Sequence, residues 1–510
     1  MSLWSDITAK LFGPKPIEPV VTTPQQSADS ATTSKVEIIS ESFIPPGLSI
    51  GSVIPKERAA ANSMSIRKTV AKYGRVDFPP GRIQLTDDIR LHSGCEINGF
   101  PSRQTPTTIG PMQESANVAA RGDNGEWFSV FNTNVPAGNN PRVGERYGIP
   151  EGPSHNVTIK NLVIDCAFDD QINDNHGSKT TCQGVSIEGC GIRLSNVKIV
   201  NPARGFGGGE CFPIRIAAPQ ERVYGASRTI VLGCEVTDPG YAGKTHNGGA
   251  GYEITCITVA GSPGNIIENP LIAHCRVYDM KRDSKQPSPI HAFHTAYTRG
   301  ALITGNYVAD VDGVGYYVDT GRSWNTSISG NKFLGVYRGV FLNAMSDFVQ
   351  TDMEISGNTI QMFENTPGWM MDAPPAGIIL QRSGAGMSAF NSIHFEGNRI
   401  IGRKANFKGI GSLGYYPRGF YFRFDNKASA TNLSVFRNTI DVPGFDSGIG
   451  KDYYPQQPDS MAIYFASKSA WDASNPMVRC VDNRNPLGSP LMTTVVDEGF
   501  KPWQQVKQLA

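Results

Sequence analysis

Aspartate recurs at one position of a repeating pattern in the middle of the chain. Each repeat has an apolar strand, a turn at Asn or Cys, and a second short strand. Four residues after that turn stand Asp165, Val200, Asp238, Asp279, Asp310 and Gly335. If the repeats stack at the ~4.8 Å spacing of neighbouring strands, these carboxyls lie close enough for the acid, base or nucleophile roles of glycoside hydrolysis. An Asp that only ends a strand and opens a turn gives the same pattern, and this alternative stays open.

A second polar column follows the glycine that introduces the third strand of many repeats. Four residues past that glycine stand Glu188, Thr255, Asp319, Asn343, Gln381 and Arg423. Glu253 lies two residues before Thr255 and faces the same way at the period of a strand. Glu253 and Asp319 flank the strand HAFHTAY, which carries His291 and His294. We therefore expect a carboxylate–imidazole group on adjacent repeats, with an ordinary solvated sheet face as the alternative.

These columns define the predicted site. The catalytic candidates are Asp279, Asp310, Asp312, Asp319 and Glu253, where Asp312 lies between the two columns. A sugar ring needs a flat apolar face beside hydrogen-bonding groups, which Tyr and Trp supply. The substrate-binding candidates are therefore His291, His294, Tyr317, Arg322 and Trp324. Aromatic residues also fill protein interiors, so some of the rings near these carboxylates are expected in the core.

Metal and partner expectations follow from composition. The chain has nine cysteines and no CxxC pair, so a zinc site is not expected. No cofactor is predicted, and calcium enters only if the reaction is an elimination. The 47 basic and 46 acidic residues supply no field for nucleic acid. No run of ~18 apolar residues exists to insert into a membrane.

The repeats themselves indicate the architecture. The turn residues are Asn161, Asn196, Cys234, Cys275, Asn306, Asn331, Asn358, Asn398, Asn438 and Asn483, with gaps of 25 to 45 residues. The shorter gaps leave no room for a helix in each repeat. The pattern predicts an all-β, parallel β-helix of about ten coils, in which stacked Asn side chains bond along the axis. We expect apolar residues on an outward face, at Phe341, Ile379, Tyr421 and Ile463, to be buried by association of three chains.

The remaining segments are assigned by composition. Residues 1–35 combine a short amphipathic stretch with a Pro/Ser/Thr-rich linker and read as a docking peptide or a disordered leader. Residues 36–153 hold one helix, Glu57–Gly74, with Met64, Ile66, Val70 and Tyr73 on its apolar face, then the first coils and an irregular insertion. The β-helix body is assigned to 154–485 and a tail to 486–510. The first residues lack the apolar core of a signal peptide, and an odd number of buried cysteines fits synthesis in a reducing cytoplasm.

The segment from the predicted helix through VDFPPGRIQLTDDIRLHSGCEINGF resembles the cap and first coil of the pectate-lyase-like right-handed β-helix superfamily. NVTIKNLVIDCAFDD and GVSIEGCGIRLSNVKIVNP resemble its middle coils, and the resemblance covers about residues 57–485. The polygalacturonase and pectate lyase signatures are missing, which disfavours those two activities.

Together with the N-terminal linker, the chain looks most like a bacteriophage tailspike. This resemblance implies a homotrimer on the virion tail, assembled in the host cytoplasm, that binds and depolymerises host surface polysaccharide by hydrolysis or β-elimination. It also implies that residues 1–35 dock onto another phage tail or baseplate protein. A glycan-binding adhesin of the same fold and a cellular carbohydrate-active enzyme remain the alternatives.

Overall fold

The computed structural model describes residues 56–111, 127–133, 152–166, 181–202, 211–219, 228–237, 254–262, 264–280, 290–318, 323–345, 350–362, 375–383, 388–402, 417–424, 429–442, 462–466, 478–497 and 500–506. All of them belong to one of the two units into which the chain divides, Ile38–Ala510. The predicted docking segment 1–35 therefore lies outside the described residues. Within the described residues, no helix is both long enough and apolar enough to cross a membrane.

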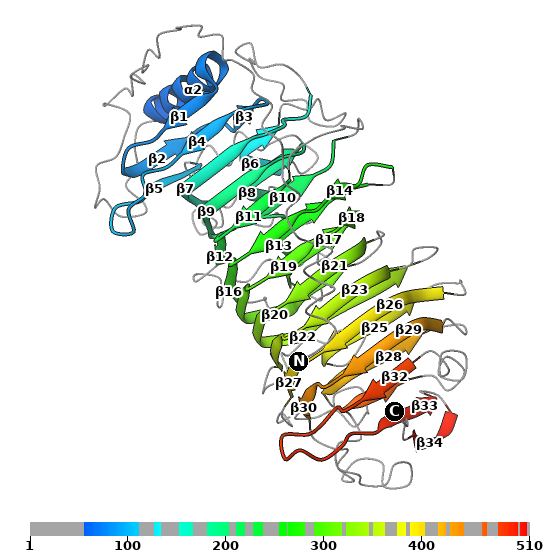
Figure 1. The fold of residues 1–510 in the computed structure, drawn as a ribbon. Coiled ribbons are helices and arrows are strands. Elements are labelled where there is room, and N and C mark those ends of the chain that lie inside the picture. Colours follow the sequence, from blue (N-terminus) through cyan, green and yellow to red (C-terminus); the bar gives the residue numbers. More distant parts are fainter. Residues whose placement is uncertain are drawn as a thin grey trace, which may run out of the picture. The chain divides into compact units, whose positions relative to one another are not determined.

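The strands pair in three parallel columns, which we name the first, second and third sheets (Figure 1). The first sheet contains β1 (Arg75–Asp77), β4 (Glu96–Asn98), β7 (Thr158–Asp165), β9 (Arg193–Val200), β11 (Ile230–Leu232), β15 (Leu271–Ala273), β19 (Leu302–Thr304), β21 (Ser323–Ser329), β23 (Gln350–Ser356), β26 (Ser388–Glu396), β29 (Ser429–Phe436) and β32 (Val478–Val481). Two short strands, β14 (Ile267–Glu268) and β18 (Thr298–Arg299), extend it beside β21.

The second sheet follows the first in each coil. It contains β2 (Gly81–Leu85), β5 (Thr107–Pro111), the later parts of β7 and β9, β12 (Glu235–Thr237), β16 (Arg276–Met280), the first parts of β20 (Tyr307–Val318) and β22 (Lys332–Met345), β24 (Thr359–Met362), β27 (Arg399–Ile401) and β30 (Thr439–Asp441).

The third sheet completes the coil. It contains β3 (Ile89–Leu91), β6 (Trp127–Thr133), β8 (Thr181–Glu188), β10 (Ile214–Ala217), β13 (Ile254–Ala260), β17 (Ile290–Ala296), the later parts of β20 and β22, β25 (Ala376–Ser383), β28 (Arg418–Phe424), β31 (Ile463–Phe465) and β33 (Thr493–Asp497). The last strand, β34 (Phe500–Val506), pairs antiparallel with β33. Each strand pairs with its equivalent in the next coil, so the predicted parallel β-helix is confirmed.

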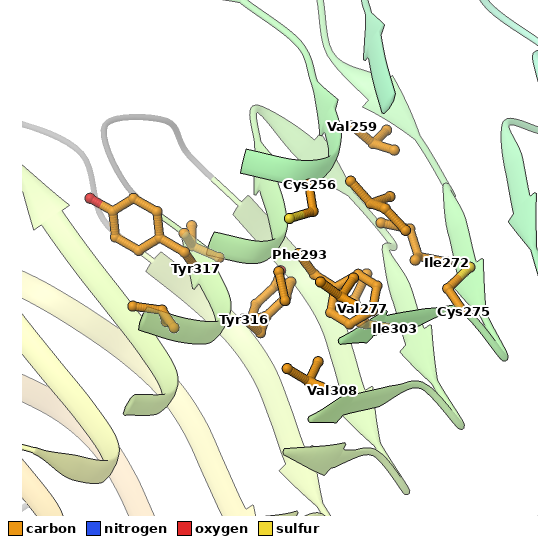
Figure 2. Packing of buried hydrophobic residues seen from close by; sticks show 14 of the residues in the cluster. Cys256, Val259, Ile272, Cys275, Val277, Phe293, Ile303, Val308, Tyr316 and Tyr317 are labelled. Atoms are coloured by element: carbon orange, nitrogen blue, oxygen red, sulfur yellow. The ribbon is translucent and has the colours of Figure 1, made fainter. Parts of the chain in front are cut away.

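The interior of the coils is apolar and continuous. Figure 2 shows Phe293, Val277 and Ile303 packed together from three different strands, with Tyr316 beside them. The Tyr316 hydroxyl shares a 2.6 Å hydrogen bond with Thr295 Oγ1, and burial raises the pKa of Tyr316. A buried hydroxyl is tolerated there because it has a partner.

The predicted asparagine ladder is present at the turn between the first and second sheets. Its buried members are Asn306, Asn331, Asn358, Asn398, Asn438 and Asn483. Each Nδ2 donates to the Oδ1 of the next member at 2.9–3.0 Å, and in the central rung Asn358 Nδ2 also donates to the Ile328 carbonyl at 2.8 Å. Cys275 begins the ladder, because its backbone N–H donates to Asn306 Oδ1. The side-chain amides therefore join consecutive coils along the axis.

The predicted ladder register is wrong by one residue in the first coils of the body. Cys234 follows β11, and the pairing of β11 and β12 with β9 places it opposite Val197, while Asn196 lies opposite Gly233. Asn161 and Asn196 both have positive φ, as Gly233 does, so they occupy the left-handed position that precedes the ladder. Asparagine tolerates this conformation, which is why it appears at either of the two positions.

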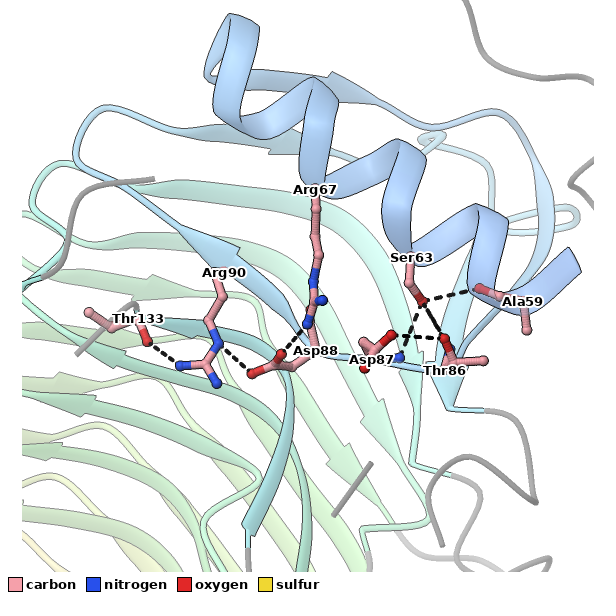
Figure 3. Close-up of polar contacts among 8 residues, drawn as sticks. All are labelled: Ala59, Ser63, Arg67, Thr86, Asp87, Asp88, Arg90 and Thr133. Carbon is pink, nitrogen blue, oxygen red and sulfur yellow. Dashed lines mark hydrogen bonds and ion pairs between the residues drawn. The ribbon is translucent and has the colours of Figure 1, made fainter. Parts of the chain in front are cut away.

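The helix α2 (Lys56–Tyr73) covers the first coil, as predicted, but with a different face inward. Ile66 and Val70 are buried, whereas Met64 and Tyr73 are 42% and 48% exposed. In their place Asn62 and Ser63 are buried because they meet the backbone of the adjacent strand: Ser63 Oγ accepts from the Thr86 N–H at 2.9 Å (Figure 3). The buried face of the helix therefore combines Ile66 and Val70 with polar residues that hydrogen-bond to the adjacent strand.

Arg67 of the same helix extends this polar contact. It donates to Asp88 through Nη2 at 2.6 Å, and Asp88 also pairs with Arg90 at 2.7 Å (Figure 3).

The apolar column predicted to be exposed is buried within the single chain. Phe341, Ile379 and Tyr421 are at most 7% exposed. Ile463 is out of register, because it pairs with Phe420 and the next residue, Tyr464, pairs with Tyr421. The physical basis that we gave for association of three chains is therefore wrong.

Candidate functional site

The longest stretches of sequence between described strands come directly before or after the strands of the third sheet. From β7 onward, the first and second sheets are joined by tight turns at the ladder. The stretches of chain that enter and leave the third sheet are longer, for example residues 238–253 before β13 and 281–289 before β17. Insertions in solenoids gather on the binding face. The outer face of the third sheet is therefore the candidate binding face.

One outward column runs the length of that face. Strand pairing places its members in register as Arg90, Asn132, Ser186, Arg215, Thr258, His294, Tyr317, Phe341, Ile379, Tyr421 and Tyr464. Their neighbours in sequence, such as Phe293 and Tyr316, point inward and are fully buried. In Figure 2 the Tyr317 ring points away from the packed interior, on the opposite side of its strand from Tyr316. The column changes from polar to aromatic at His294 and Tyr317.

Three of the predicted substrate-binding residues meet at this change. The Tyr317 ring centroid lies 4.1 Å from that of His291 and 5.7 Å from that of His294, and the Phe341 ring lies 5.0 Å away on the other side. His294 is half-buried, while His291 and Tyr317 are 2% and 8% exposed. Two imidazoles and a phenol in contact can accept and donate protons at one place. We call His291, His294 and Tyr317 the His–Tyr cluster.

Thr258 and Arg338 were missed by sequence reasoning. Thr258 pairs with His294 from the preceding coil, and the Arg338 guanidinium lies 4.8 Å from the Phe341 ring centre. Counting four residues from a glycine also aligned Thr255 with Glu188, which is wrong. Strand pairing places Thr255 opposite His291, and it aligns Glu188 first with Ala217 and then with Ala260. Only the pairing of whole strands corrects the count, because it aligns Glu188 with Ala260 rather than with Thr255.

The aspartate column lies elsewhere, at the end of the second sheet. Asp279 is opposite Asp310, because the residues on either side of them pair. Both are exposed, and both adopt the left-handed conformation, with φ of 56° and 54°. Gly335 continues the same position with φ of 61°, and Asn201 precedes it with 51°. A backbone corner of this kind favours Asp, Asn and Gly, so it accounts for the recurrence of Asp without catalysis.

Asp165 does not belong to that column. It pairs with Val200, one residue before the left-handed position, and is buried. Asn201 Nδ2 donates to its Oδ1 at 3.0 Å, and Arg82 Nη2 lies 3.5 Å from its Oδ2. Its place in the predicted column was an error of register.

The remaining candidates are divided among three places. Asp312 is half-buried at a bulge, where the pairing of β20 with β22 shifts between Val311 and Val314. Trp324 lies in the first sheet, with the Arg299 guanidinium 4.9 Å from its ring centre, rather than with the His–Tyr cluster. Glu253, Asp319 and Arg322 fall outside the described residues, so their predicted roles stay predictions.

No group of three or more His, Cys, Asp or Glu side chains suited to a metal ion lies within the described part of the chain.

No protein-family model and no curated protein matches this sequence. Solved structures do resemble it. A surface adhesin of Streptococcus pneumoniae, PfbA, is 13% identical with a TM-score of 0.44, over 86% of this chain and 85% of that one. The catalytic domain of a GH87 α-1,3-glucanase in complex with nigerose is 11% identical with a TM-score of 0.41, over 89% and 70%. Tailspike protein 3 of bacteriophage CBA120 is 13% identical with a TM-score of 0.29, over 80% and 57%. Similarity this distant assigns neither an activity nor a biological role to the chain.

Proposed function

We propose that the outer face of the third sheet binds an extended polysaccharide and that the His–Tyr cluster cleaves it. The observation that carries the proposal is the contact of Tyr317 with both His291 and His294 on this face. Such a cluster can take a proton from one atom of a bound sugar and give one to another.

The cluster is suited to β-elimination from a uronic acid polymer. His294 is the more accessible imidazole and takes the proton from C5, next to the sugar carboxylate. The C5–H electron pair forms the C4–C5 double bond as the bond from C4 to the glycosidic oxygen breaks. Tyr317 gives its hydroxyl proton to the departing oxygen. His291, packed against the Tyr317 ring, positions the phenol.

Two point substitutions test this assignment. Tyr317→Phe keeps the ring and removes only the hydroxyl, and His294→Gln removes the base, so each should lower the cleavage rate about 10²- to 10⁴-fold while sugar binding largely survives. His394→Gln is the matched control, because His394 is an exposed histidine of β26 in the first sheet. The measurement is ultraviolet absorbance of the new double bond and release of reducing ends, on capsule and lipopolysaccharide from a panel of bacteria.

The outcomes separate the reaction types. Cleavage at wild-type rate by both variants would reject the cluster. Reducing ends without a double bond would indicate hydrolysis, and the paired carboxyls of Asp279 and Asp310 would then be the groups to replace by Asn.

A glycan-binding adhesin of the same fold is the second candidate. The left-handed, exposed geometry of Asp279 and Asp310 favours it, because that geometry accounts for both aspartates as corner residues. Retention of labelled polysaccharide by the wild-type protein, without any product, would select this alternative.

We further propose that the protein acts as a phage tailspike on a host bacterium. Support comes from the sequence features of residues 1–35 and from the β-helix that follows them. Detection of the chain in purified virions, and a light-scattering mass of three times 55.2 kDa, are the expected results. A particle of the monomer mass at micromolar concentration would reject the trimer, and a bacterial chromosomal gene among carbohydrate-metabolism genes would indicate the cellular enzyme instead.

A further inference from the structure

A groove of about 620 Å³ lies on the side of the solenoid where the first and second sheets meet. Its floor includes Lys198, Glu235 and Arg276, which follow one another on the outer face of β9, β12 and β16. Its wall comes from the connection between β4 and β5, and Phe100 and Arg103 are among the residues that line it. The third sheet closes the opposite side of each coil, so the groove is separate from the His–Tyr cluster.

The wall is a loop in one coil that is longer than the corresponding turns of the later described coils. Later described coils pass from the first to the second sheet through the tight ladder turn, whereas residues 99–106 form a longer connection here. Gly99 anchors it: its N–H donates to the Lys160 carbonyl at 2.8 Å, and a Cβ at this position would lie 2.0 Å from the Asn161 carbonyl oxygen. At the next residue, the Phe100 N–H donates to Thr107 Oγ1 at 2.8 Å. The loop is therefore held against the turn by its backbone.

The groove carries an excess of positive charge. Arg103, Lys198 and Arg276 line it against one carboxylate, Glu235. Lys198 Nζ lies 3.5 Å from Glu235 Oε2, and Arg276 Nη1 lies 3.6 Å from Oε1. Because the Lys198 and Arg276 side chains are still 36% and 53% exposed, both can reach a ligand without losing Glu235.

The Tyr278 hydroxyl forms hydrogen bonds with both Lys198 and Glu235. Lys198 Nζ donates to its hydroxyl at 3.0 Å, and that hydroxyl donates to Glu235 at 3.2 Å. Partial burial works against the charge of Lys198, but the bond to Tyr278 and the carboxylate of Glu235 outweigh it and leave its pKa raised. The ammonium group is therefore charged and held in place at neutral pH.

We propose that this groove binds an acidic oligosaccharide, a segment of a few sugars that bear carboxylates. Its volume is typical of small-ligand sites, which lie in the range of about 300–1,000 Å³. Sugar carboxylates pair with Arg276 and Lys198, since charge-assisted hydrogen bonds to Arg and Lys are the strong ones. Phe100, 42% exposed at the wall, offers a flat apolar face to a sugar ring. Such a second site would hold a long polymer to the protein independently of what happens at the third sheet.

Calorimetric titration of the full chain with defined hexamers tests the proposal. The acidic probes are hexamers of galacturonate, of mannuronate and of α2,8-linked sialic acid, and maltohexaose is the neutral comparison. The titrations use a protein background carrying Tyr317→Phe and His294→Gln, so that cleavage at the third sheet does not consume the probe. Because the third sheet still binds sugar in this background, two sites are fitted, and the proposal fails if Arg276→Gln and Lys198→Gln change the affinity of neither site. At least one acidic hexamer should bind, and Arg276→Gln and Lys198→Gln should each weaken that binding about tenfold. Added salt should weaken it as well.

Arg399→Gln is the matched control. Arg399 is exposed on β27 and belongs to the same outward column as Arg276, reached through Tyr307, Lys332 and Thr359, but it does not line the groove. It should leave the affinity unchanged. The proposal is overturned if no acidic hexamer binds, if maltohexaose binds equally well, or if Arg399→Gln weakens binding as much as Arg276→Gln. It is also overturned if Arg276→Gln alters only the particle mass in light scattering, since the groove would then be a contact between copies of the chain.

Discussion

Asn358 is the central rung of the ladder, and its replacement by Ala should strongly destabilise the solenoid. The side chain is 1% exposed and makes bonds on both sides. Its Oδ1 accepts from the Asn331 backbone N–H at 3.0 Å and from Asn331 Nδ2 at 2.9 Å. Its Nδ2 donates to the Ile328 carbonyl and to Asn398 Oδ1. Truncation to Ala removes all of these bonds at once.

The loss of stability depends on which buried polar groups Asn358→Ala leaves without another hydrogen-bond partner. Asn331 Nδ2 still donates to Ile303, and Asn398 Oδ1 still accepts from the Asn358 backbone N–H. The Asn331 N–H and the Ile328 carbonyl each lose a bond. Each buried polar group left without a partner costs about 1–3 kcal/mol, so we expect Asn358→Ala to lower the free energy of unfolding by about 2–6 kcal/mol. Asn358→Asp should cost at least as much, because it brings a buried charge against two acceptor oxygens.

Thr359→Ala is the control for this experiment. Thr359 is the next residue, half-buried on the outer side of the second sheet, and its loss should cost under about 1 kcal/mol. Solenoids need not unfold in one step, so thermal melting is combined with hydrogen exchange of the Asn331 amide. Asn358→Ala should lower the melting temperature and speed that exchange, yet leave the cleavage that we propose for the third sheet unchanged while the protein is folded. If Asn358→Ala melted with Thr359→Ala and Asn331 kept its protection, the ladder would not be the stabilising element that we describe.

Three further predictions concern other parts of the molecule. Arg75 lowers the pKa of Asp77, and Lys160 lowers the pKa of Glu96. A carboxyl whose folded pKa lies below its unfolded value contributes stability that is complete above about pH 4 and is lost as the pH falls through the folded pKa. The melting temperature should therefore decline modestly in acid, and Asp77→Asn should flatten that decline. Gly313→Ala would place a Cβ 1.9 Å from the Ile290 carbonyl oxygen, so it should lower the free energy of chemical unfolding by at least about 2 kcal/mol. It should also lower the proposed cleavage, because His291 follows Ile290. Wild-type stability of this variant would contradict the close packing of Gly313 on Ile290. Burial raises the pKa of Cys95 to about 11, so mass spectrometry should find it unmodified by a thiol reagent at pH 8 in the native protein and modified in denaturant.

The sequence alone determined the architecture and the ladder. A residue that occupies the same place in every coil recurs along the chain, so the stacked asparagines and the third strands are visible as a repeat without any structure. Sequence spacing also brought His291, His294 and Tyr317 into one set of binding candidates, and these three side chains do meet.

Only the tertiary structure showed which residues of neighbouring coils lie opposite each other, which outward side chains are buried, and which distant residues lie close together. Asn196 and Asn306 look equivalent in sequence, because asparagine suits both the left-handed position before the ladder and the buried position of the ladder itself. Only strand pairing shows that Asn196 occupies the first of these positions and Asn306 the second. The outward ring of Tyr421 is buried although its pattern predicts exposure, because coverage by other parts of the chain has no period. The groove at Lys198 and Arg276 depends on a loop from an earlier coil, held there by backbone bonds that carry no side-chain signature except Gly99. Contacts between coils are non-local, and local spacing determines them only where the repeat is strict.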